Sequence, residues 1–110
     1  MAITKTDLFT EQQQQAAELF KAMGHPARLA ILDILSQRQA CFCGDITEEL
    51  PLAQSTVSQH LKALKAAGLI KGEIDGVKTC YCLSENGVAL LKELADPIIE
   101  QLNLINKTCC

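Results

Sequence analysis

The sequence lacks any hydrophobic run that approaches the ~18 residues of a membrane-spanning helix, although 48% of its residues are hydrophobic. It also begins without the basic and then apolar segments of a secretory leader. We therefore expect a soluble, cytoplasmic protein that makes no membrane contact. There is no internal repeat and no low-complexity linker, so the 110 residues should form one domain, small enough that a dimer with a shared core would be no surprise.

Familiar catalytic motifs are also missing. The chain has no Cys-x-x-Cys, no Gly-x-Ser-x-Gly, no phosphate-binding loop and no paired acids suited to acid–base catalysis. We therefore do not expect an enzyme, and a thiol enzyme or metal carrier stays a remote alternative. The formal charge of -3 argues against an indiscriminate polyanion binder, but residues 54–83 carry four lysines and two acids, a local charge of +2.

Residues 50–70 form the most informative stretch. Three apolar residues recur there at helical spacing, Val57, Leu61 and Leu64. A second face of the same helix carries hydroxyl, amide and ammonium groups, on Ser55, Ser58, Gln59 and Lys62. Such groups reach base edges and phosphates when a helix enters the DNA major groove. The spacing predicts a helix with one buried face and one face for DNA; the alternative is an ordinary amphipathic surface helix.

The flanking residues support the DNA-binding interpretation. Asp45 with Glu48 is a variant of the capping box and predicts a short helix that Pro51 ends, so residues 45–67 read as a helix-turn-helix. After Gly68 the apolar residues alternate, which predicts strands at residues 69–74 and 78–83 around the turn Asp75-Gly76. These two strands would form a wing at residues 69–83.

Helical spacing also occurs on both sides of this region. A first helix should follow the N-cap Thr10 and cover residues 11–23, and a second should start at Pro26 and run to about residue 37. His25 beside the turn should cap or make a structural hydrogen bond rather than bind a metal. Residues 85–106 predict a last helix, with a kink at Pro97 or a restart capped by Asp96. Residues 1–8 should be a mobile start, and the fold class is mainly α with a small β-hairpin wing.

The six cysteines occur in three pairs, Cys41 with Cys43, Cys80 with Cys82, and Cys109 with Cys110. In a reducing compartment, clustered thiols more often bind soft metals or sense oxidants than hold a scaffold together. The alternative is that they fill the core as small apolar side chains. The last pair could supply ligands, form a reactive pair, or simply lie in a frayed end.

The order of these features resembles the ArsR/SmtB family of winged-helix repressors. The resemblance rests on Gly-His-Pro-Ala-Arg-Leu-Ala-Ile-Leu, on Cys-Phe-Cys and on Gln-Ser-Thr-Val-Ser-Gln-His-Leu-Lys-Ala-Leu-Lys-Ala-Ala-Gly-Leu-Ile, and it covers roughly residues 9–104. It implies a homodimer formed by the first helix and the last helix at residues 85–106, bound to a palindromic double-stranded DNA operator. It also implies that a metal, metalloid or oxidant relieves repression.

The resemblance assigns DNA contacts to the recognition helix and to the wing at residues 71–78. It adds two residues to the polar helical face, so the expected DNA-binding residues are Ser55, Thr56, Ser58, Gln59, His60, Lys62, Lys71 and Lys78. The wing departs from the family by carrying Glu73 and Asp75 near its tip. Ala53 stands where the family usually has a hydroxyl N-cap, which should cost the helix about 1 kcal/mol.

The resemblance also narrows the inducer site. A zinc site on the last helix requires histidine there, and no histidine follows His60. Members that respond to arsenic, antimony, cadmium or lead use a Cys-x-Cys pair, which Cys41 and Cys43 match, but Thr47 replaces their third cysteine. We expect no permanent cofactor, and As(III), Sb(III) or a Cd, Pb or Zn ion as the inducer.

Cys80 and Cys82 would supply the missing thiols. In a winged helix the short strand before the helix-turn-helix pairs with the last wing strand, so residues 41–43 should lie beside residues 79–83. Alternate residues of a strand share a face, so all four thiols point outward if Phe42, Tyr81 and Leu83 point inward. Because paired strands lie about 5 Å apart, these thiols could share an ion or form disulfides. The sequence thus predicts a repressor released by a thiophilic ligand, with a disulfide-switched repressor as the alternative.

Overall fold

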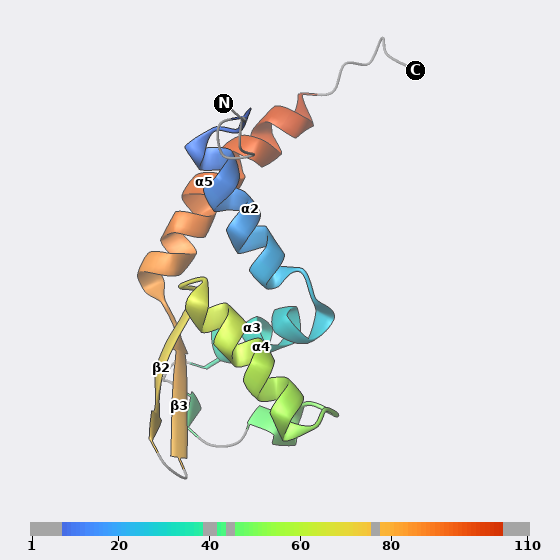
Figure 1. The fold of residues 1–110 in the computed structure, drawn as a ribbon, viewed down its shortest axis with the longest axis vertical. Coiled ribbons are helices and arrows are strands. Elements are labelled where there is room, and N and C mark those ends of the chain that lie inside the picture. The colour runs from blue at the N-terminus through green and yellow to red at the C-terminus, as the bar shows by residue number, and fades with distance from the viewer. Residues whose placement is uncertain (1–7, 39–41, 44–45, 76–77, 105–110) are drawn as a thin grey trace, which may run out of the picture.

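The computed structural model describes residues 8–38, 42–43, 46–75 and 78–104 (Figure 1). The helices α2 at Glu11–Met23 and α3 at Pro26–Ser36 come first. The strand β1 at Phe42–Cys43 and the 3-10 helix η1 at Ile46–Glu49 precede the helix α4 at Gln54–Ala66. The strands β2 at Ile70–Asp75 and β3 at Lys78–Leu83 form a hairpin, and the helix α5 follows at Glu85–Asn103. This order confirms the predicted fold class, mainly α with a β-hairpin wing.

Local sequence explains where the helices begin and end. Thr10 forms a capping box before α2, because its Oγ1 accepts from the Gln13 N–H and its own N–H donates to Gln13 Oε1, both at 3.0 Å. Ser84 caps α5 by accepting from the Gly87 N–H at 3.1 Å. Gly68 follows α4 with φ of +81°, a conformation that favours glycine. Ala53, in contrast, precedes α4 without a side-chain cap, as the sequence predicted.

The three strands form one antiparallel sheet in the order β1-β3-β2. β1 pairs with β3, with Phe42 opposite Tyr81 and Cys43 opposite Cys80, which confirms the predicted pairing of these segments. β2 pairs with β3 from Ile70 opposite Leu83 to Asp75 opposite Lys78. The central strand β3 therefore carries both the wing partner and the partner of the Cys-Phe-Cys segment.

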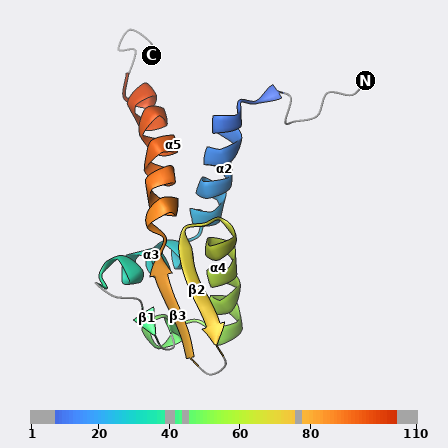
Figure 2. The same cartoon turned by 90° about the vertical axis from the view of Figure 1, so that its left-hand side faces the viewer.

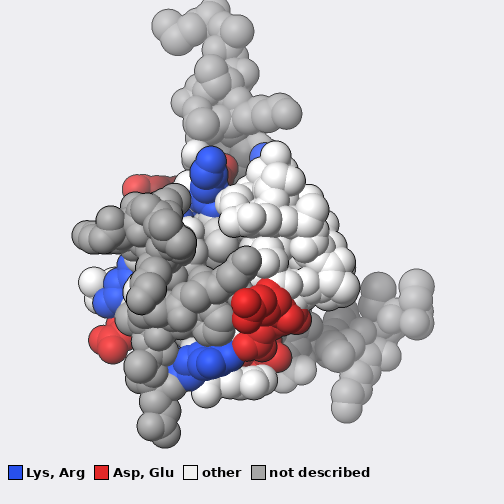
Figure 3. Space-filling model, turned by 90° about the horizontal axis from the view of Figure 1, so that it is seen from below, with Lys and Arg blue, Asp and Glu red and all other residues white. Residues whose placement is uncertain are grey.

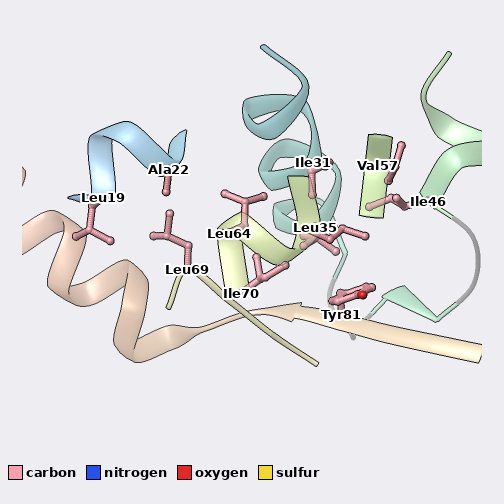
Figure 4. Close-up of a cluster of buried hydrophobic side chains, with 11 residues drawn as sticks. Leu19, Ala22, Ile31, Leu35, Ile46, Val57, Leu64, Leu69, Ile70 and Tyr81 are labelled. Carbon is pink, nitrogen blue, oxygen red and sulfur yellow. The ribbon is translucent and has the colours of Figure 1, made fainter. Parts of the chain in front are cut away.

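The core lies between α4, α3 and the sheet (Figure 4). The predicted apolar stripe of α4, Val57, Leu61 and Leu64, is buried in it. The other buried members come from α2, α3, η1, β2 and β3 and from the turn before β2: Leu19, Ala22, Ile31, Leu35, Ile46, Leu69, Ile70 and Tyr81. Because the apolar stripe of α4 is covered, the opposite side of this helix is left at the surface.

The helices α2 and α5 extend beyond this core and lie side by side (Figures 1 and 2). Large apolar side chains on these helices and just beside them are exposed: Leu8, Phe9, Phe20, Val88, Leu90, Ile99, Leu102 and Leu104. A groove between the two helices is lined by both, with Gln13 on one side and Leu94 on the other. The pair thus presents an apolar surface that this single chain does not cover.

The structure specifies the form of two predicted helices. The short helix before Pro51 is a four-residue 3-10 helix, and its closing bond runs from the Leu50 N–H to the Thr47 carbonyl at 3.3 Å. So short a segment favours the tighter i→i+3 bonds. Of the two possibilities predicted at Pro97, a kink or a restart, the restart does not occur: α5 continues through Pro97, since proline removes only one of the backbone N–H donors of this 19-residue helix. Asp96 does not cap a helix; its Oδ2 accepts from Lys92 Nζ at 2.7 Å.

Some predictions fall on residues outside the described part of the chain. These are most of the predicted mobile start, Gly76 of the predicted turn Asp75-Gly76, and residues 105–106 of the last helix. Within the described ranges, no helix is long and apolar enough to cross a membrane.

Candidate functional site

The outer face of α4 carries the polar groups that the sequence assigned to DNA. Ser55, Gln59 and Lys62 are exposed at spacings of four and three residues, so they form one row along the helix. Thr56 and Ser58 are partly buried beside this row. The row presents a hydroxyl, an amide and an ammonium group, which can donate to base edges and phosphates.

His60 does not belong to this outer face, and the structure corrects its predicted position. The side chain is 8% exposed, and its Nδ1 accepts a hydrogen bond from Arg28 Nε at 3.1 Å. Burial, and then the nearby His25 and Arg28, lower the pKa of His60 below its usual value. The spacing contained this signal, because position 60 falls three residues after Val57 and four before Leu64, on the buried stripe.

The surface at the wing end of the molecule is of mixed charge. Figure 3 shows acidic side chains gathered in one patch beside basic side chains. One ion pair links the residues after α3 to η1: Arg38 Nη2 pairs with Glu49 Oε1. The described surface is therefore no uniformly basic platform, and recognition by α4 relies on specific polar groups as well as charge.

The wing is tied directly to α4. Lys65 Nζ donates to the Gly72 carbonyl of β2 at 2.7 Å. Gly72 lies opposite Tyr81, and a Cβ at position 72 would lie 2.2 Å from the Cys80 carbonyl oxygen, so this close approach requires glycine. Lys71 is exposed on β2, whereas the side chain of Lys78 lies outside the described part. Lys65 and Gly72 were not singled out from the sequence, because a bond between a lysine and a distant carbonyl has no local pattern.

Two cysteines of the predicted thiol site lie on the central strand. Cys80 and Cys82 are partly buried, and both are disulfide-bonded. Tyr81 between them is buried, and burial raises the pKa of its phenol. The backbone of Cys43 lies opposite Cys80. Cys41, Cys109 and Cys110 lie outside the described residues, within which no group of three or more His, Cys, Asp or Glu side chains could hold a metal ion.

His25 has the structural role predicted for it. It is the N-cap of α3, and its Nδ1 accepts from the Ala27 N–H at 3.0 Å. A nitrogen that accepts this bond has no lone pair left for a metal. The capping interaction fixes the first turn of α3, where Arg28 reaches back towards α4.

Known proteins are similar to this chain in both sequence and fold. A family model described as "Bacterial regulatory protein, arsR family" matches residues 25–71. The chain is 34% identical to the "Transcriptional repressor SmtB homolog" of Synechocystis sp., over 82% of this chain and 68% of that protein. It is 33% identical to the "Arsenical resistance operon repressor" of Staphylococcus aureus, over 84% of this chain and 82% of that protein.

A solved structure agrees with these sequence matches. HlyU from Vibrio cholerae superimposes with a TM-score of 0.63 at 31% identity, covering 82% of this chain and 97% of that chain. The reduced form of the same protein superimposes with a TM-score of 0.61. With its recognition helix, wing and helix order, the chain belongs to the ArsR/SmtB family of winged-helix transcriptional repressors.

Proposed function

We propose that this repressor binds its operator as a homodimer and is released when a thiophilic ligand engages Cys41, Cys43, Cys80 and Cys82. One observation carries the proposal: the antiparallel register sets Cys43 opposite Cys80. We infer that Cys80 and Cys82, once reduced, supply further thiols beside the Cys-Phe-Cys segment, because this segment pairs with their strand. Soft thiolates suit As(III), Sb(III), Cd, Pb or Zn.

Similarity to the arsenical resistance operon repressor supports arsenite or antimonite as the ligand. These ions bind soft sulfur ligands, and Thr47 leaves the first Cys-x-Cys pair without the third cysteine expected of this type of site. The second pair on β3 would supply it. Mg and Ca ions prefer oxygen ligands, so these cysteines would not bind them well.

For DNA, we propose that Ser55, Gln59 and Lys62 enter the major groove, with Thr56 and Ser58 beside them. Lys71 and Lys78 of the wing would contact the phosphate backbone of the DNA next to that groove. Two such helices in a two-fold dimer would read half-sites about one helical turn apart. The homodimer would bury the apolar surface of α2 and α5 described above. His60 is left out of this set because it is buried.

Release requires that the ligand bind the free conformation more tightly than the DNA-bound one. The central strand offers a physical route. The cysteines lie on β3, Gly72 of β2 pairs with Tyr81 between them, and Lys65 joins Gly72 to the recognition helix. A coupling of about 1–3 kcal/mol along this route would weaken operator binding roughly 5- to 150-fold.

The proposal can be tested by fluorescence anisotropy with a duplex taken from the DNA upstream of the protein's own coding sequence. Reduced protein should bind, and near-stoichiometric arsenite or cadmium should release it. The double variant Cys80→Ser, Cys82→Ser should bind DNA normally and respond to neither ligand. The matched control, Cys109→Ser with Cys110→Ser, separates the terminal pair from the strand pair, and an unchanged response in the first variant would contradict the proposed site.

A second candidate is a redox-switched repressor, favoured by the disulfide bonding of Cys80 and Cys82. The solved relative HlyU is also known in a reduced form. In such a switch each pair of thiols forms one S–S bond, losing two protons and passing two electrons to an oxidant such as a peroxide. Release of DNA by peroxide and recovery by dithiothreitol, with no effect of arsenite on reduced protein, would favour this function over the first.

A further inference from the structure

A polar cluster joins three helices behind the proposed DNA-binding face. Arg28 of α3 donates from Nε to His60 Nδ1 of α4 and from Nη1 to the Ala22 carbonyl in the last turn of α2, both at 3.1 Å. Apart from Tyr81 with its phenol, His60 is the one buried side chain that carries a polar group among the described residues. A single guanidinium group therefore holds the recognition helix against the two helices before it.

His25 completes the cluster. Its ring lies 4.4 Å from the ring of His60, centroid to centroid, at an interplanar angle of 43°. Both rings use Nδ1 as an acceptor, His25 from the Ala27 N–H and His60 from Arg28. A ring nitrogen that accepts a hydrogen bond carries no proton, so the contact with Arg28 requires a neutral His60 imidazole, with the proton on Nε2.

Protonation of His60 would break this arrangement. Its Nδ1 would become a donor aimed at the Arg28 guanidinium, so the hydrogen bond would be replaced by repulsion. The elements that pack against α4 are α2, α3, η1 and β2. Among the described residues, the charges that act on His60 are those of His25, the N-cap of α3, and Arg28 in α3. The other charged side chains described on these elements or just after α3 are exposed: Glu11, Glu18, Lys21, Asp33, Arg38, Glu48, Glu49 and Lys71.

We propose that Arg28 and His25 are positioning residues that hold the recognition helix in its DNA-binding place only while His60 is neutral, so that acidification lowers operator affinity. This inference rests on the proposed contact of α4 with DNA, but it does not depend on the ligand that the cysteines bind. It assigns a role to the Gly-His-Pro-Ala-Arg segment that differs from both DNA contact and metal binding.

The direction of the pH effect follows from linkage. In the unfolded chain His60 titrates near its usual value of about 6.5, and in the folded chain its pKa is lower. Between these two values the unfolded chain binds more protons, so stability rises with pH there. Stability is fully present above the usual value and is lost as the pH falls through it towards the folded pKa.

The decisive variant is His60→Asn. Asparagine Oδ1 can take the place of Nδ1 and accept from Arg28, but it does not titrate. We would measure melting temperatures, and anisotropy on the upstream duplex, from about pH 7.5 to about pH 5, because the melting temperature should begin to fall near the usual histidine pKa of about 6.5 and the affinity should fall below it, where the folded protein takes up the proton. Wild-type protein should lose melting temperature and several-fold in affinity on acidification, whereas His60→Asn should match it at the higher pH and show flat profiles.

Two further variants separate positioning from mere stability. His25→Asn keeps an N-cap acceptor but removes the second ring, so the acid-induced loss should persist and become smaller. Arg28→Met should weaken DNA binding at both pH values, and Arg28→Lys should restore part of the affinity. Profiles of His60→Asn that follow those of the wild type would overturn the proposal.

The outcomes also distinguish this inference from the proposed function. A wild type that binds no duplex at any pH would contradict the DNA role of α4, and with it the effect on affinity. The melting profiles would still decide whether His60 couples protonation to helix packing. A wild type that binds DNA equally well across the range would overturn the inference while leaving the repressor function intact.

Discussion

Single residues fix the two ends of the recognition helix in different ways. At its start, the first-turn N–H groups of α4 receive no side-chain acceptor from Ala53. Beyond its end, the Gly68 turn packs against the first turn of α5, where a Cβ on Gly87 would lie 1.8 Å from the Gly68 carbonyl oxygen. A side-chain cap at position 53 should therefore raise the stability of the protein, whereas a side chain at position 87 should lower it.

Ala53→Ser should stabilise the protein by about 1 kcal/mol, because the serine hydroxyl can accept from the N–H of Ser55 or Thr56. The backbone at position 53 is already extended, with φ of -66° and ψ of 147°, as an N-cap requires. Chemical denaturation measures the gain. Ala53→Val is the control, since valine supplies no acceptor and is a poor N-cap residue, and an equal gain in both variants would argue against a capping effect.

Gly87→Ala should destabilise the protein by about 2 kcal/mol, even though alanine favours helices, because the new methyl group would collide with the backbone of Gly68. Thermal and denaturant unfolding would measure this loss. Asn86→Ala, at the exposed neighbouring position, should leave stability within a few tenths of a kcal/mol. A neutral Gly87→Ala would mean that α5 can shift away from the turn without cost.

At the scale of whole elements, β3 and α4 are joined through one side-chain bond. Lys65 donates to the carbonyl of Gly72, which lies opposite Tyr81 between the two cysteines of β3. A change in strand geometry at the cysteines would thus reach the recognition helix through β2. Lys65 is exposed, so its competing role would be a simple phosphate contact.

Lys65→Met should reduce the factor by which arsenite or peroxide weakens operator binding, because the link between sheet and helix is lost. Anisotropy with and without ligand measures this factor. If Lys65 instead contacts a DNA phosphate, Lys65→Met should reduce the slope of log affinity against log salt concentration by about one. The factor by which the ligand weakens operator binding should then stay unchanged.

The neighbouring Lys62 on the outer row provides the matched comparison for that experiment. Lys62→Met should lower affinity and reduce the salt slope by about one unit, since its ammonium group should lie on a phosphate. The ligand-dependent factor should be unaffected. Equal behaviour of the two lysine variants would contradict separate roles for positions 62 and 65.

At the scale of the whole molecule, α2 and α5 form an extension that a single chain leaves uncovered. Leu102 is 72% exposed and lines the groove between these helices together with Leu90. An exposed apolar surface that extends along two helices is typical of a protein–protein interface. A second copy of the chain, related by two-fold symmetry, would cover the same surface on both chains. We expect this dimer to set the separation of the two recognition helices.

The double variant Leu90→Glu, Leu102→Glu should therefore be monomeric in sedimentation equilibrium and bind its operator at least tenfold more weakly, since one half-site is lost. Its circular dichroism should stay close to that of the wild type. Leu29→Glu, at an exposed apolar position on α3, is the control and should remain dimeric. A dimeric double variant would place the interface elsewhere.

Much of the candidate site could be predicted from the sequence. The row Ser55, Gln59 and Lys62 lies on the exposed face because helical spacing and a buried apolar stripe leave it no other place. The pairing of the Cys-Phe-Cys segment with β3 followed from the resemblance and was confirmed. The contacts of Arg28 and Lys65 were missed, because hydrogen bonds between distant residues leave no periodic signal.

The sequence by itself determined the order of helices and strands, the capping of α2, the missing cap at Ala53 and the alternation of the wing. These depend on neighbours within about one turn or one strand, whose spacing is written in the chain. Only the tertiary structure decided that Arg28 is the partner of His60, that Lys65 reaches the Gly72 carbonyl and that Gly87 must touch Gly68. The partner of His60 lies 32 residues away in the sequence, and a buried polar group can be assigned only when its partner is in place.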